Sequence, residues 1–274
     1  MQVLLNISNL CKNYRTRGFL RVNDKRQGRS MGTKKTKKEP GFAFGPVNFT
    51  IERNKILAIV GESGSGKSSL VQTIAGLKRQ TSGEIYLKGK PLSNLSQQER
   101  CKSIRMIFHD PDSSLNQKMT IGKTLLIPLR LNTNLTKTQC FQQIKETLNL
   151  VGLLPDYLTY YPQMLSVVQQ HQLAIARALI LNPDIIIADE ILSTLDISLR
   201  FKIINLLLKI QEQRDVSFIF VAHNMHLVKH MSDQVIVMHS GIIVEHNSAQ
   251  NIFSKPQSEI TKRLLQNQQS DYRR

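Results

Sequence analysis

The chain has 274 residues and a formal net charge of +17 at neutral pH. That length is enough to bury the core of one large domain or of two small ones. No apolar run approaches the roughly 18 residues of a membrane-spanning helix, and residues 1–10 lack the basic and apolar regions of a secretory signal. Three widely spaced cysteines, an odd number, argue against a disulfide framework or a zinc site and favour a reducing cytosol.

The positive charge is concentrated near the start of the chain. Residues 15–38 hold ten lysines and arginines against one acid, Asp24, and ten minus one gives this stretch a net charge of +9. Such a stretch is typical of a solvated loop, and it also fits binding to nucleic acid or to anionic lipid. Its one aromatic residue is Phe19, so the sequence does not predict a surface on which bases stack. We therefore expect a basic insertion at residues 15–40 and do not expect a nucleic-acid partner.

Strand-like and helix-like patterns alternate along the rest of the chain. Short apolar or alternating runs predict strands over residues 3–7, 44–51, 56–60, 83–87, 103–108, 184–190, 217–222, 235–238 and 242–244. Helical spacing predicts helices over 70–77, 199–213 and 259–265, and several between 120 and 177 with breaks at Pro128, 152–155 and 161–162. Strands that alternate with helices predict an α/β core. The tail from about residue 247 is polar, with the last helix as its one predicted element.

A glycine-rich segment follows the predicted strand 56–60 and precedes the predicted helix 70–77. Its residues are Gly61, Glu62, Ser63, Gly64, Ser65, Gly66, Lys67, Ser68 and Ser69. A strand, the pattern G-x-x-x-x-G-K-S and a helix form the context of a phosphate-binding P-loop. In such a loop the backbone N–H groups and the helix N-terminus point at phosphate. Lys67 would reach the β- and γ-phosphates, and Ser68 would place its hydroxyl on Mg²⁺.

Two acids end the most apolar predicted strand, 184–190. Asp189 is suited to hold Mg²⁺ directly or through water, as a residue on a second strand must in a P-loop enzyme. Glu190 should point away from Asp189, because successive side chains of a strand alternate, and it is the natural general base for a water that attacks the γ-phosphate. The alternative is an acidic cap on the helix that follows, and the P-loop favours the catalytic interpretation.

His223 ends the neighbouring predicted strand, 217–222. A histidine at this place could hydrogen-bond the γ-phosphate and sense whether that phosphate is present. A lone histidine there is more often a structural residue with satisfied hydrogen bonds, so both interpretations stay open. Residues 193–196 can likewise be interpreted as an ordinary helix cap.

Together these residues resemble the ATP-binding cassette (ABC) ATPases of membrane transporters, over nearly the whole chain outside 15–40. Within that family the chain is most similar to the oligopeptide, dipeptide and nickel importer branch. The segments that carry this closer resemblance are 105–111 with 114–116, 151–155, 176–179, 233–238 and 255–265. Residues 128–133, 160–162 and 192–196 are similar in turn to the ATPases of the Sap systems, which are named for sensitivity to antimicrobial peptides.

The resemblance implies a fold and a division of the chain. The implied fold is α/β, with a RecA-like P-loop NTPase core, an antiparallel β-subdomain and an inserted helical subdomain. Residues 1–246 would form the ABC ATPase domain, with the helical subdomain at about 112–172. Residues 247–274 would form a C-terminal extension that faces the transporter.

The resemblance also implies ATP as the nucleotide and a role for each of several residues. Tyr14 would stack on adenine, although a tyrosine at a strand end can also be a core aromatic. His223 would be the switch histidine, and Asp196 would bridge the two subunits of an ATPase dimer. Ser166 and Gln169 belong to the signature segment, which closes over the γ-phosphate of the ATP held by the opposite subunit.

The chain departs from the family pattern at two places. The signature L-S-G-G-Q is replaced by residues 165–169, L-S-V-V-Q, and two β-branched residues oppose the close backbone approach that glycine allows. Ser166 still offers its hydroxyl and the helix N-terminus its field, and the valines are harmless if their side chains point away. His109 replaces the glutamine that contacts Mg²⁺ and the attacking water, so it is a further candidate for the metal site, although it is bulkier and titrates near neutral pH.

The favoured function is that of an ATP-hydrolysing subunit that powers a membrane transporter of peptides or related cationic solutes. The expected partners are a second ABC ATPase subunit, two transmembrane permease subunits and, indirectly, a periplasmic solute-binding protein, at the cytoplasmic face of a bacterial inner membrane. A homodimer would carry two damaged signature segments, so a heterodimer is favoured. Two alternatives stay open, namely a soluble regulatory or nucleic-acid-associated ABC ATPase and a weakly active nucleotide-binding scaffold.

Overall fold

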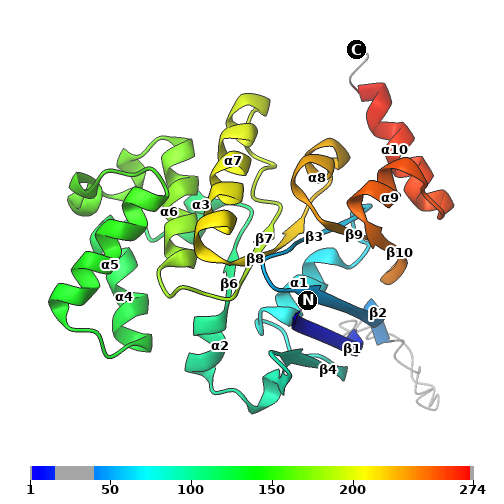
Figure 1. The fold of residues 1–274 in the computed structure, drawn as a ribbon, viewed down its shortest axis with the longest axis horizontal. Helices are drawn as coiled ribbons and strands as arrows, with labels where there is room; N and C mark the ends of the chain where they lie inside the picture. Colours follow the sequence, from blue (N-terminus) through cyan, green and yellow to red (C-terminus); the bar gives the residue numbers. More distant parts are fainter. Residues whose placement is uncertain (1, 16–39, 272–274) are drawn as a thin grey trace, which may run out of the picture.

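The computed structural model of the protein describes residues 2–15 and 40–271 (Figure 1). That part of the chain forms an α/β body with one six-stranded and one four-stranded sheet. The first strand ends at Arg15 and the second begins at Pro40, and these two residues are paired in the four-stranded sheet. The interior of the predicted basic insertion, residues 16–39, lies outside the described residues, and so does its predicted role.

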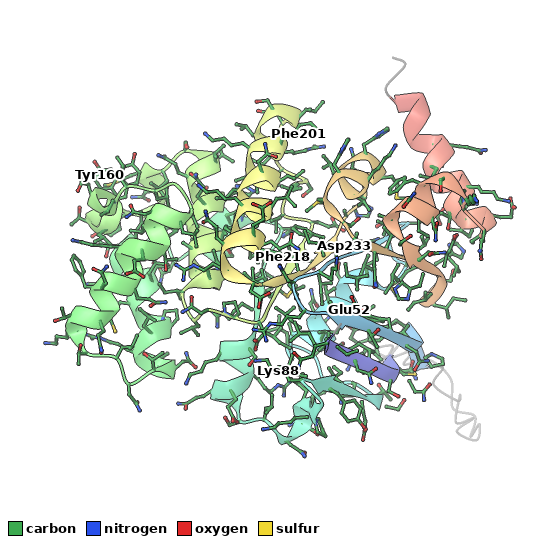
Figure 2. The ribbon with its side chains drawn as sticks, viewed as in Figure 1. Glu52, Lys88, Tyr160, Phe201, Phe218 and Asp233 are labelled. Atoms are coloured by element: carbon green, nitrogen blue, oxygen red, sulfur yellow. The ribbon has the colours of Figure 1, made fainter. Side chains whose placement is uncertain are left out.

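The six-stranded sheet has the strand order β10-β9-β3-β8-β7-β6. The bounds of its strands are β3 Ile56–Gly61, β6 Ile104–Ile107, β7 Ile185–Asp189, β8 Ser217–Val221, β9 Gln234–His239 and β10 Ile242–Ser248. The strands from β9 to β6 pair in parallel, and β10 joins β9 as an antiparallel hairpin. Every residue of β3, β7 and β8 is buried, as expected for parallel strands covered on both faces. Figure 2 shows Phe218 of β8 near the centre of the molecule, where it is fully buried.

Parallel pairing places the carboxyl ends of these strands at one edge of the sheet. The strands β3, β7 and β8 end there at Gly61, Asp189 and Val221. Ligands of open α/β sheets bind outside such an edge, in the crevice between loops. The predicted P-loop, Glu190 and His223 follow these strand ends directly, so the topology gathers them although up to 162 residues separate them, from Gly61 to His223.

The four-stranded sheet is antiparallel and has the order β2-β1-β4-β5. Its strands are β1 Val3–Arg15, β2 Pro40–Glu52, β4 Ser82–Leu87 and β5 Lys90–Pro91. Leu5 and Phe44 from this sheet share one apolar core with Ile59 of β3 and with helix α1, Lys67–Ile74. The predicted strands 3–7 and 44–51 are the inner parts of β1 and β2, which continue beyond the apolar positions because the two strands keep pairing with each other.

The other helices cover the six-stranded sheet and form a separate group at one end of the molecule (Figure 1). Their bounds are α2 Gln97–Ser103, α3 Pro111–Ser114, α4 Ile121–Asn132, α5 Lys137–Leu150, α6 Val167–Leu179, α7 Ile197–Arg214, α8 Met225–Met231, α9 Ala249–Ser254 and α10 Glu259–Asp271. Apolar residues of α4, α5 and α6 share one core with α7 and with one face of β7 and β8. None of the helices that the structure describes is both long enough and apolar enough to span a bilayer.

The predicted break at Pro128 is wrong, because α4 continues through this residue to Asn132. A proline inside a helix removes one backbone hydrogen bond and costs about 3 kcal/mol. Leu125 and Leu129 lie on either side of Pro128, and both are buried in the helical core. Their burial outweighs the lost bond, and the helix ends four residues later than predicted.

Besides the four-residue α3, three short helices were not predicted from the sequence. These are α2, α8 and α9, with seven, seven and six residues, too few for a clear helical period. Each begins at a polar cap, since Ser96, Asn224 and Ser248 accept hydrogen bonds from backbone N–H groups of the first turn. The tail after residue 247 therefore contains two helices, α9 and α10, and not one.

The last helix, α10, is fixed to the body at its first turns. The buried carboxylate of Glu245 accepts hydrogen bonds from the backbone N–H groups of Gln257 and Ser258 and from the hydroxyl of Thr261. Farther along the helix, Nη2 of Arg263 lies 2.5 Å from Oε1 of the P-loop residue Glu62. The C-terminal helix thus touches the glycine-rich loop across 201 residues of sequence.

Candidate functional site

The P-loop joins β3 to α1 along a path that requires glycine at two points. Gly61 has a φ of +150°, and a Cβ there would lie 2.1 Å from the carbonyl oxygen of Met238. Gly66 has a φ of +97°, and a Cβ there would lie 2.5 Å from the carbonyl oxygen of Ala43. No side chain caps the N-terminus of α1, so its first N–H groups remain available to an anion. The loop therefore forms a backbone cradle with the polarity that a phosphate needs.

The ammonium group of Lys67 lies inside this cradle. Lys67 is buried, and its Nζ donates hydrogen bonds to the carbonyl oxygens of Gly61, at 2.9 Å, and Glu62, at 2.8 Å. Burial lowers the pKa of Lys67, and the nearby charges of Glu190 and Asp189 oppose this shift. The Lys67 ammonium group is thus held by the loop and lies near the two acids. This is the position expected of a lysine that contacts the terminal phosphates.

Ser68 and Asp189 meet as predicted for a pair of metal ligands. The Ser68 hydroxyl donates a hydrogen bond of 3.1 Å to Oδ1 of Asp189, which is 8% exposed. Burial raises the pKa of Asp189, and the hydrogen bond from Ser68 and the positive charges of His109 and Lys67 partly oppose this. Among the described residues no cluster of three or more His, Cys, Asp or Glu side chains could hold a metal. The two oxygens fit Mg²⁺, which takes one or two protein ligands and completes its shell with phosphate and water.

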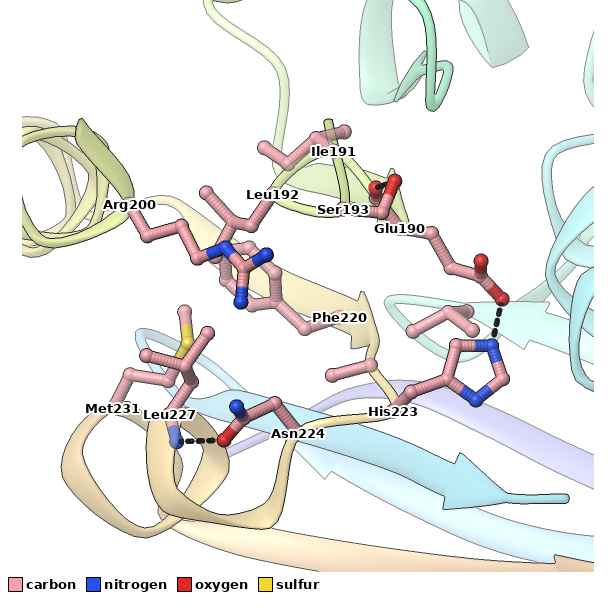
Figure 3. Close-up of a pocket in the computed structure, with 12 residues that line it drawn as sticks. Glu190, Ile191, Leu192, Ser193, Arg200, Phe220, His223, Asn224, Leu227 and Met231 are labelled. Atoms are coloured by element: carbon pink, nitrogen blue, oxygen red, sulfur yellow. Dashed lines mark hydrogen bonds and ion pairs between the residues drawn. The ribbon is translucent and has the colours of Figure 1, made fainter. Parts of the chain in front are cut away.

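Glu190 lies just beyond β7, in a turn with a φ of +53°. Strand alternation was the reason given for the prediction that Glu190 points away from Asp189. That reason is wrong, because β7 ends at Asp189 and the turn sets the direction of the Glu190 side chain. The backbone N–H of Glu190 donates to the carbonyl oxygen of Val221 at 3.1 Å. Its Oε1 lies 2.6 Å from Nε2 of His223, the contact drawn in Figure 3. The carboxylate is thus held at the carboxyl edge of the sheet.

One cleft of about 490 Å³ collects most of the predicted site residues. The predicted residues that line it are Tyr14, Ser63, Gly64, Gly66, Lys67, Ser68, Ser69, Glu190 and His223. Ala43 and Ser240 also line the cleft, and sequence reasoning missed both. Ser240 belongs to the β9–β10 turn, and only the sheet order, with β9 beside β3, shows that this turn lies next to the P-loop.

Tyr14 is a surface residue, so the alternative that it is a core aromatic is wrong. It is 36% exposed near the end of β1. The phenol oxygen lies 3.3 Å from Oγ of Ser69 and accepts a hydrogen bond of 2.5 Å from Nζ of Lys78. Burial raises the pKa of Tyr14, but the hydrogen bonds and the positive charges of Lys78 and Lys12 outweigh it and lower the pKa. The ring stands at the rim of the cleft, with Nζ of Lys12 and Nζ of Lys78 lying 5.3 Å and 5.1 Å from its centroid.

The signature segment keeps a regular helix start despite its two valines. Ser166 is the N-cap of α6, because its Oγ accepts from the backbone N–H of Gln169 and the Gln169 side chain accepts from the backbone N–H of Ser166. Val168 is 9% exposed and packs into the helical core, whereas Val167 is 53% exposed. One valine therefore points away from the surface, and the other lies on it beside Ser166.

A buried histidine joins this helix to the loop that follows Glu190. His171 is 2% exposed. Its Nδ1 lies 2.9 Å from the carbonyl oxygen of Val167, and its Nε2 lies 3.0 Å from the carbonyl oxygen of Ile191. The start of α6 and the residue after Glu190 are thus held by one side chain, which the sequence did not single out.

Several predicted site residues do not line the cleft, among them Ser166, Gln169 and Asp196. Asp196 is exposed and caps α7, since its Oδ1 accepts from the backbone N–H of Leu199 at 2.9 Å. His109 follows β6 and lines a different cleft, although it is close enough for its charge to lower the pKa of Asp189. The chain therefore gathers one set of predicted residues in the cleft and presents a second set elsewhere on its surface.

An apolar cavity of about 210 Å³ lies behind the pair of Glu190 and His223 (Figure 3). Leu192, Phe220, Leu227 and Met231 contribute to its wall. Glu190 therefore borders this pocket as well as the cleft lined by the P-loop.

A comparison with known families settles the class of the protein. Residues 44–193 match the model of a family described as ABC transporter. The chain belongs to the ABC transporter family. The predicted family and its peptide-transport branch are confirmed by the curated relatives that the chain resembles.

Two similar relatives carry the name SapF. The chain is 43% identical to the putrescine export system ATP-binding protein SapF of Escherichia coli K12 and to the peptide transport system ATP-binding protein SapF of Salmonella typhimurium. Each match spans 266 residues, 97% of this chain and 93% of the relative. The dipeptide transport ATP-binding protein DppF of Haemophilus influenzae is 39% identical over 81% of this chain and 69% of its own length.

Solved structures confirm the predicted fold, a P-loop NTPase core with an antiparallel β-subdomain and a helical subdomain. CbiO1 of Clostridium perfringens, part of an ABC transporter complex, has a TM-score of 0.75 and 24% identity, with 93% of this chain and 92% of that chain covered. The dimeric ATP-binding cassette MJ0796 with ADP and Pi has a TM-score of 0.71 and 26% identity over 90% of this chain and 99% of that one. The chain is therefore an ABC ATPase that binds ATP and whose hydrolysis is coupled to transport.

Proposed function

We propose that the chain hydrolyses ATP to move peptides or related cationic solutes across a bacterial inner membrane, from its cytoplasmic face. The observation that supports this best is the convergence of Lys67, Ser68, Asp189, Glu190 and His223 at one edge of the sheet. The relatives' names agree on transport but differ in cargo, since one names putrescine and others name peptides. Both cargoes fit a class of cationic or peptide solutes.

Each cleft residue has a distinct task in this proposal. MgATP supplies the γ-phosphoryl group that water attacks. The P-loop N–H groups and Lys67 would hold the phosphates, and Ser68 and Asp189 would hold Mg²⁺, with His109 as a further candidate ligand. Tyr14 carries the adenine ring. Glu190 takes the proton of the attacking water, and His223, 2.6 Å away, holds that carboxylate and contacts the γ-phosphate.

The remaining predicted residues act on a nucleotide held mainly by a partner ATPase. Ser166 and Gln169 start a helix whose N-terminus would face the partner's γ-phosphate. Val167 is exposed at that start, so its branched side chain would hold the partner's nucleotide away from the backbone. Asp196 would bridge the two subunits while it caps α7.

This arrangement favours a heterodimer with unequal sites. The site on this chain's P-loop would be completed by the partner's signature and stay hydrolytic, whereas the partner's P-loop would meet Val167 and hydrolyse slowly. Lys67→Ala should then abolish transport by the assembled complex, and the equivalent lysine change in the partner should reduce transport less. Equal losses from the two changes would exclude the unequal pair.

Two regions outside the cleft would contact the other subunits. The helical subdomain, about residues 112–172 within an ATPase domain of residues 1–246, would dock two permease subunits, and a periplasmic solute-binding protein would act through them. The extension 247–274 would face the transporter. Exposed apolar side chains at Leu131 and Met164 are suited to such docking.

Measuring ATP turnover of the complex with and without Glu190→Gln tests the proposal. A transporter ATPase should co-purify with two membrane subunits and lose turnover in the variant. An unchanged low turnover would favour the nucleotide-binding scaffold. Salt-sensitive nucleic-acid binding that survives deletion of residues 15–38, without membrane subunits, would favour the soluble regulatory ATPase.

A further inference from the structure

The apolar pocket of about 210 Å³ behind the nucleotide cleft lies between helices α7 and α8 (Figure 3). Most of its lining residues are apolar, and among them Leu192, Phe220, Leu227 and Met231 are each at most 9% exposed. An apolar cavity of roughly 150 Å³ is already large enough to bind one benzene molecule. The pocket can therefore hold the apolar part of a small organic molecule.

Arg200 brings one positive charge to the wall of this pocket. It lies in the first turn of α7 and is partly exposed. Its Nε donates a hydrogen bond of 2.8 Å to the carbonyl oxygen of Leu195. No carboxylate of the described residues forms an ion pair with it, so its two Nη groups can donate to an anion that enters the pocket.

Asn224 adds a second hydrogen-bond donor to the wall. It is the N-cap of α8, and its Oδ1 accepts hydrogen bonds from the backbone N–H groups of His226, at 2.9 Å, and Leu227, at 3.2 Å. Because the oxygen is turned to the helix, the amide nitrogen faces the pocket that Asn224 lines (Figure 3). A carboxylate has two oxygens that accept from guanidinium and amide groups, so the donors of the wall match this head group.

The acidic residue of the pocket lies on the side away from Arg200. Figure 3 shows Arg200 at one side and Glu190 with His223 at the other, with Phe220 between them. An anionic head group is attracted by Arg200 and repelled by Glu190. A ligand would therefore place its head at Arg200 and extend its apolar part toward the pair of Glu190 and His223.

We propose that this pocket is a regulatory site for a small amphipathic carboxylate, with its head on Arg200 and Asn224 and its tail against the apolar wall. Pockets of this kind combine a mostly apolar lining with a few polar groups that fix the orientation of the ligand. An inorganic anion would leave the apolar wall uncovered, and a neutral hydrocarbon would make no use of the two donors. The regulatory part of the inference rests on the proposed role of Glu190 as the general base.

A bound ligand would act on the two residues that the pocket shares with the nucleotide cleft, Glu190 and His223. These residues follow different strands, β7 and β8, and their contact of 2.6 Å joins the two loops. A tail packed beside both loops opposes any adjustment of the pair around a γ-phosphate. Occupancy should therefore slow hydrolysis and leave the P-loop free to bind ATP.

The first test measures binding of octanoate to the full chain by calorimetry, below the concentration at which octanoate forms micelles. We expect saturable binding, and at least about tenfold weaker binding of octanol, which lacks the charged head, and of acetate, which lacks the tail. Arg200→Gln should weaken octanoate binding at least about tenfold, and Arg200→Lys should weaken it less because it keeps the charge. Arg130→Gln, at an exposed position on α4, is the matched control and should stay within about twofold of the unaltered chain.

A second measurement locates the ligand without altering the charge. The methyl resonance of Met231, which lines the pocket, should shift as octanoate is added, whereas that of Met164, which is 59% exposed outside it, should not. Leu227→Phe enlarges a side chain of the wall and keeps Arg200, so it should also abolish octanoate binding. Binding of a fluorescent ATP analogue shows whether each variant keeps its fold.

ATP turnover of the assembled complex then tests the regulatory effect. Saturating octanoate should lower kcat severalfold with little change in KM for ATP, and it should have no effect on the complex with Arg200→Gln. Absence of saturable binding, binding that Arg200→Gln leaves unchanged, or bound octanoate with an unchanged kcat would each overturn the inference. If Glu190→Gln leaves turnover unchanged while octanoate still binds through Arg200, it is the proposed function that fails.

Discussion

Glu190 and His223 lie 2.6 Å apart, Oε1 to Nε2, although they follow two different strands of the sheet. Glu190 occupies a left-handed turn with a φ of +53°, a conformation that most side chains avoid. The histidine contact therefore holds a carboxylate that the turn alone would leave free to rotate. The base and the residue that positions it form one unit at the mouth of the nucleotide cleft.

Glu190→Gln should lower ATP turnover of the assembled complex by about 10²–10⁴-fold, the usual contribution of a general base. Glutamine keeps the size of the side chain and can still contact His223, so MgATP binding should persist. Glu212→Gln on the exposed face of α7 is the matched control. Turnover within about threefold of the unaltered complex would contradict the role of Glu190.

Asp189→Asn should weaken MgATP binding and stabilise the nucleotide-free protein at neutral pH. Burial raises the pKa of Asp189 in the folded protein, so the stability that this group contributes is lost as pH rises through the folded pKa. Asparagine does not ionise, so the variant does not lose this stability as pH rises. Its side-chain oxygen can still accept the hydrogen bond from Ser68.

Thermal unfolding midpoints of the variant and of the unaltered protein, measured with a chelator from about pH 4 to 8, test this difference in stability. The midpoints of the two proteins should lie closest at the acidic end and separate as pH rises, with the variant the more stable. Excess MgATP should reverse their order, because only the unaltered protein binds it tightly. If the variant is less stable than the unaltered protein at every pH in the presence of chelator, a raised pKa of Asp189 in the folded protein is contradicted.

Val167→Gly should raise ATP turnover of the heterodimer about twofold or more, because the partner's site regains a close backbone contact with its nucleotide. Val167→Ala keeps helix propensity and removes only the branched methyl groups, so it separates bulk from backbone freedom. Val167 is exposed, and neither change should lower the thermal midpoint noticeably. Unchanged turnover in both variants would mean that Val167 does not limit the partner's site.

His171→Ala should destabilise the protein by about 2 kcal/mol, because the buried imidazole leaves a cavity and its hydrogen bond to a backbone carbonyl oxygen is lost. In a protein of this size the thermal midpoint should fall roughly 4–8 °C. His230→Ala, at an exposed position on α8, should change stability by less than about 0.5 kcal/mol. Similar midpoints for the two variants would show that His171 does not fix α6 to the loop after Glu190.

The sequence was sufficient to predict the residues that chemistry fixes locally. The P-loop, Asp189 and the signature helix each follow from short patterns in which a strand or a helix start dictates the geometry. It was insufficient where packing between distant segments decides the outcome. Pro128 stays inside α4 because Leu125 and Leu129 are buried on both sides of it.

Residues that meet only through the sheet order were invisible in the sequence. Ser240 reaches the cleft because β9 pairs with β3, and no local pattern marks it. Arg105 of β6 and Arg177 of α6 lie 72 residues apart in the sequence and line one cleft. Such sites appear only once the fold has placed a strand end beside a helix.

The ion pair between Glu62 and Arg263 connects helix α10 to the P-loop. Arg263 sits in the second turn of α10, and Glu62 belongs to the predicted phosphate-binding loop. A dye attached to the exposed side of α10 would therefore change its signal when the loop is filled, without any label in the catalytic cleft. A bulky affinity tag fused beyond α10 would pull on the same connection, so a tag at the other end of the chain leaves the nucleotide loop less disturbed.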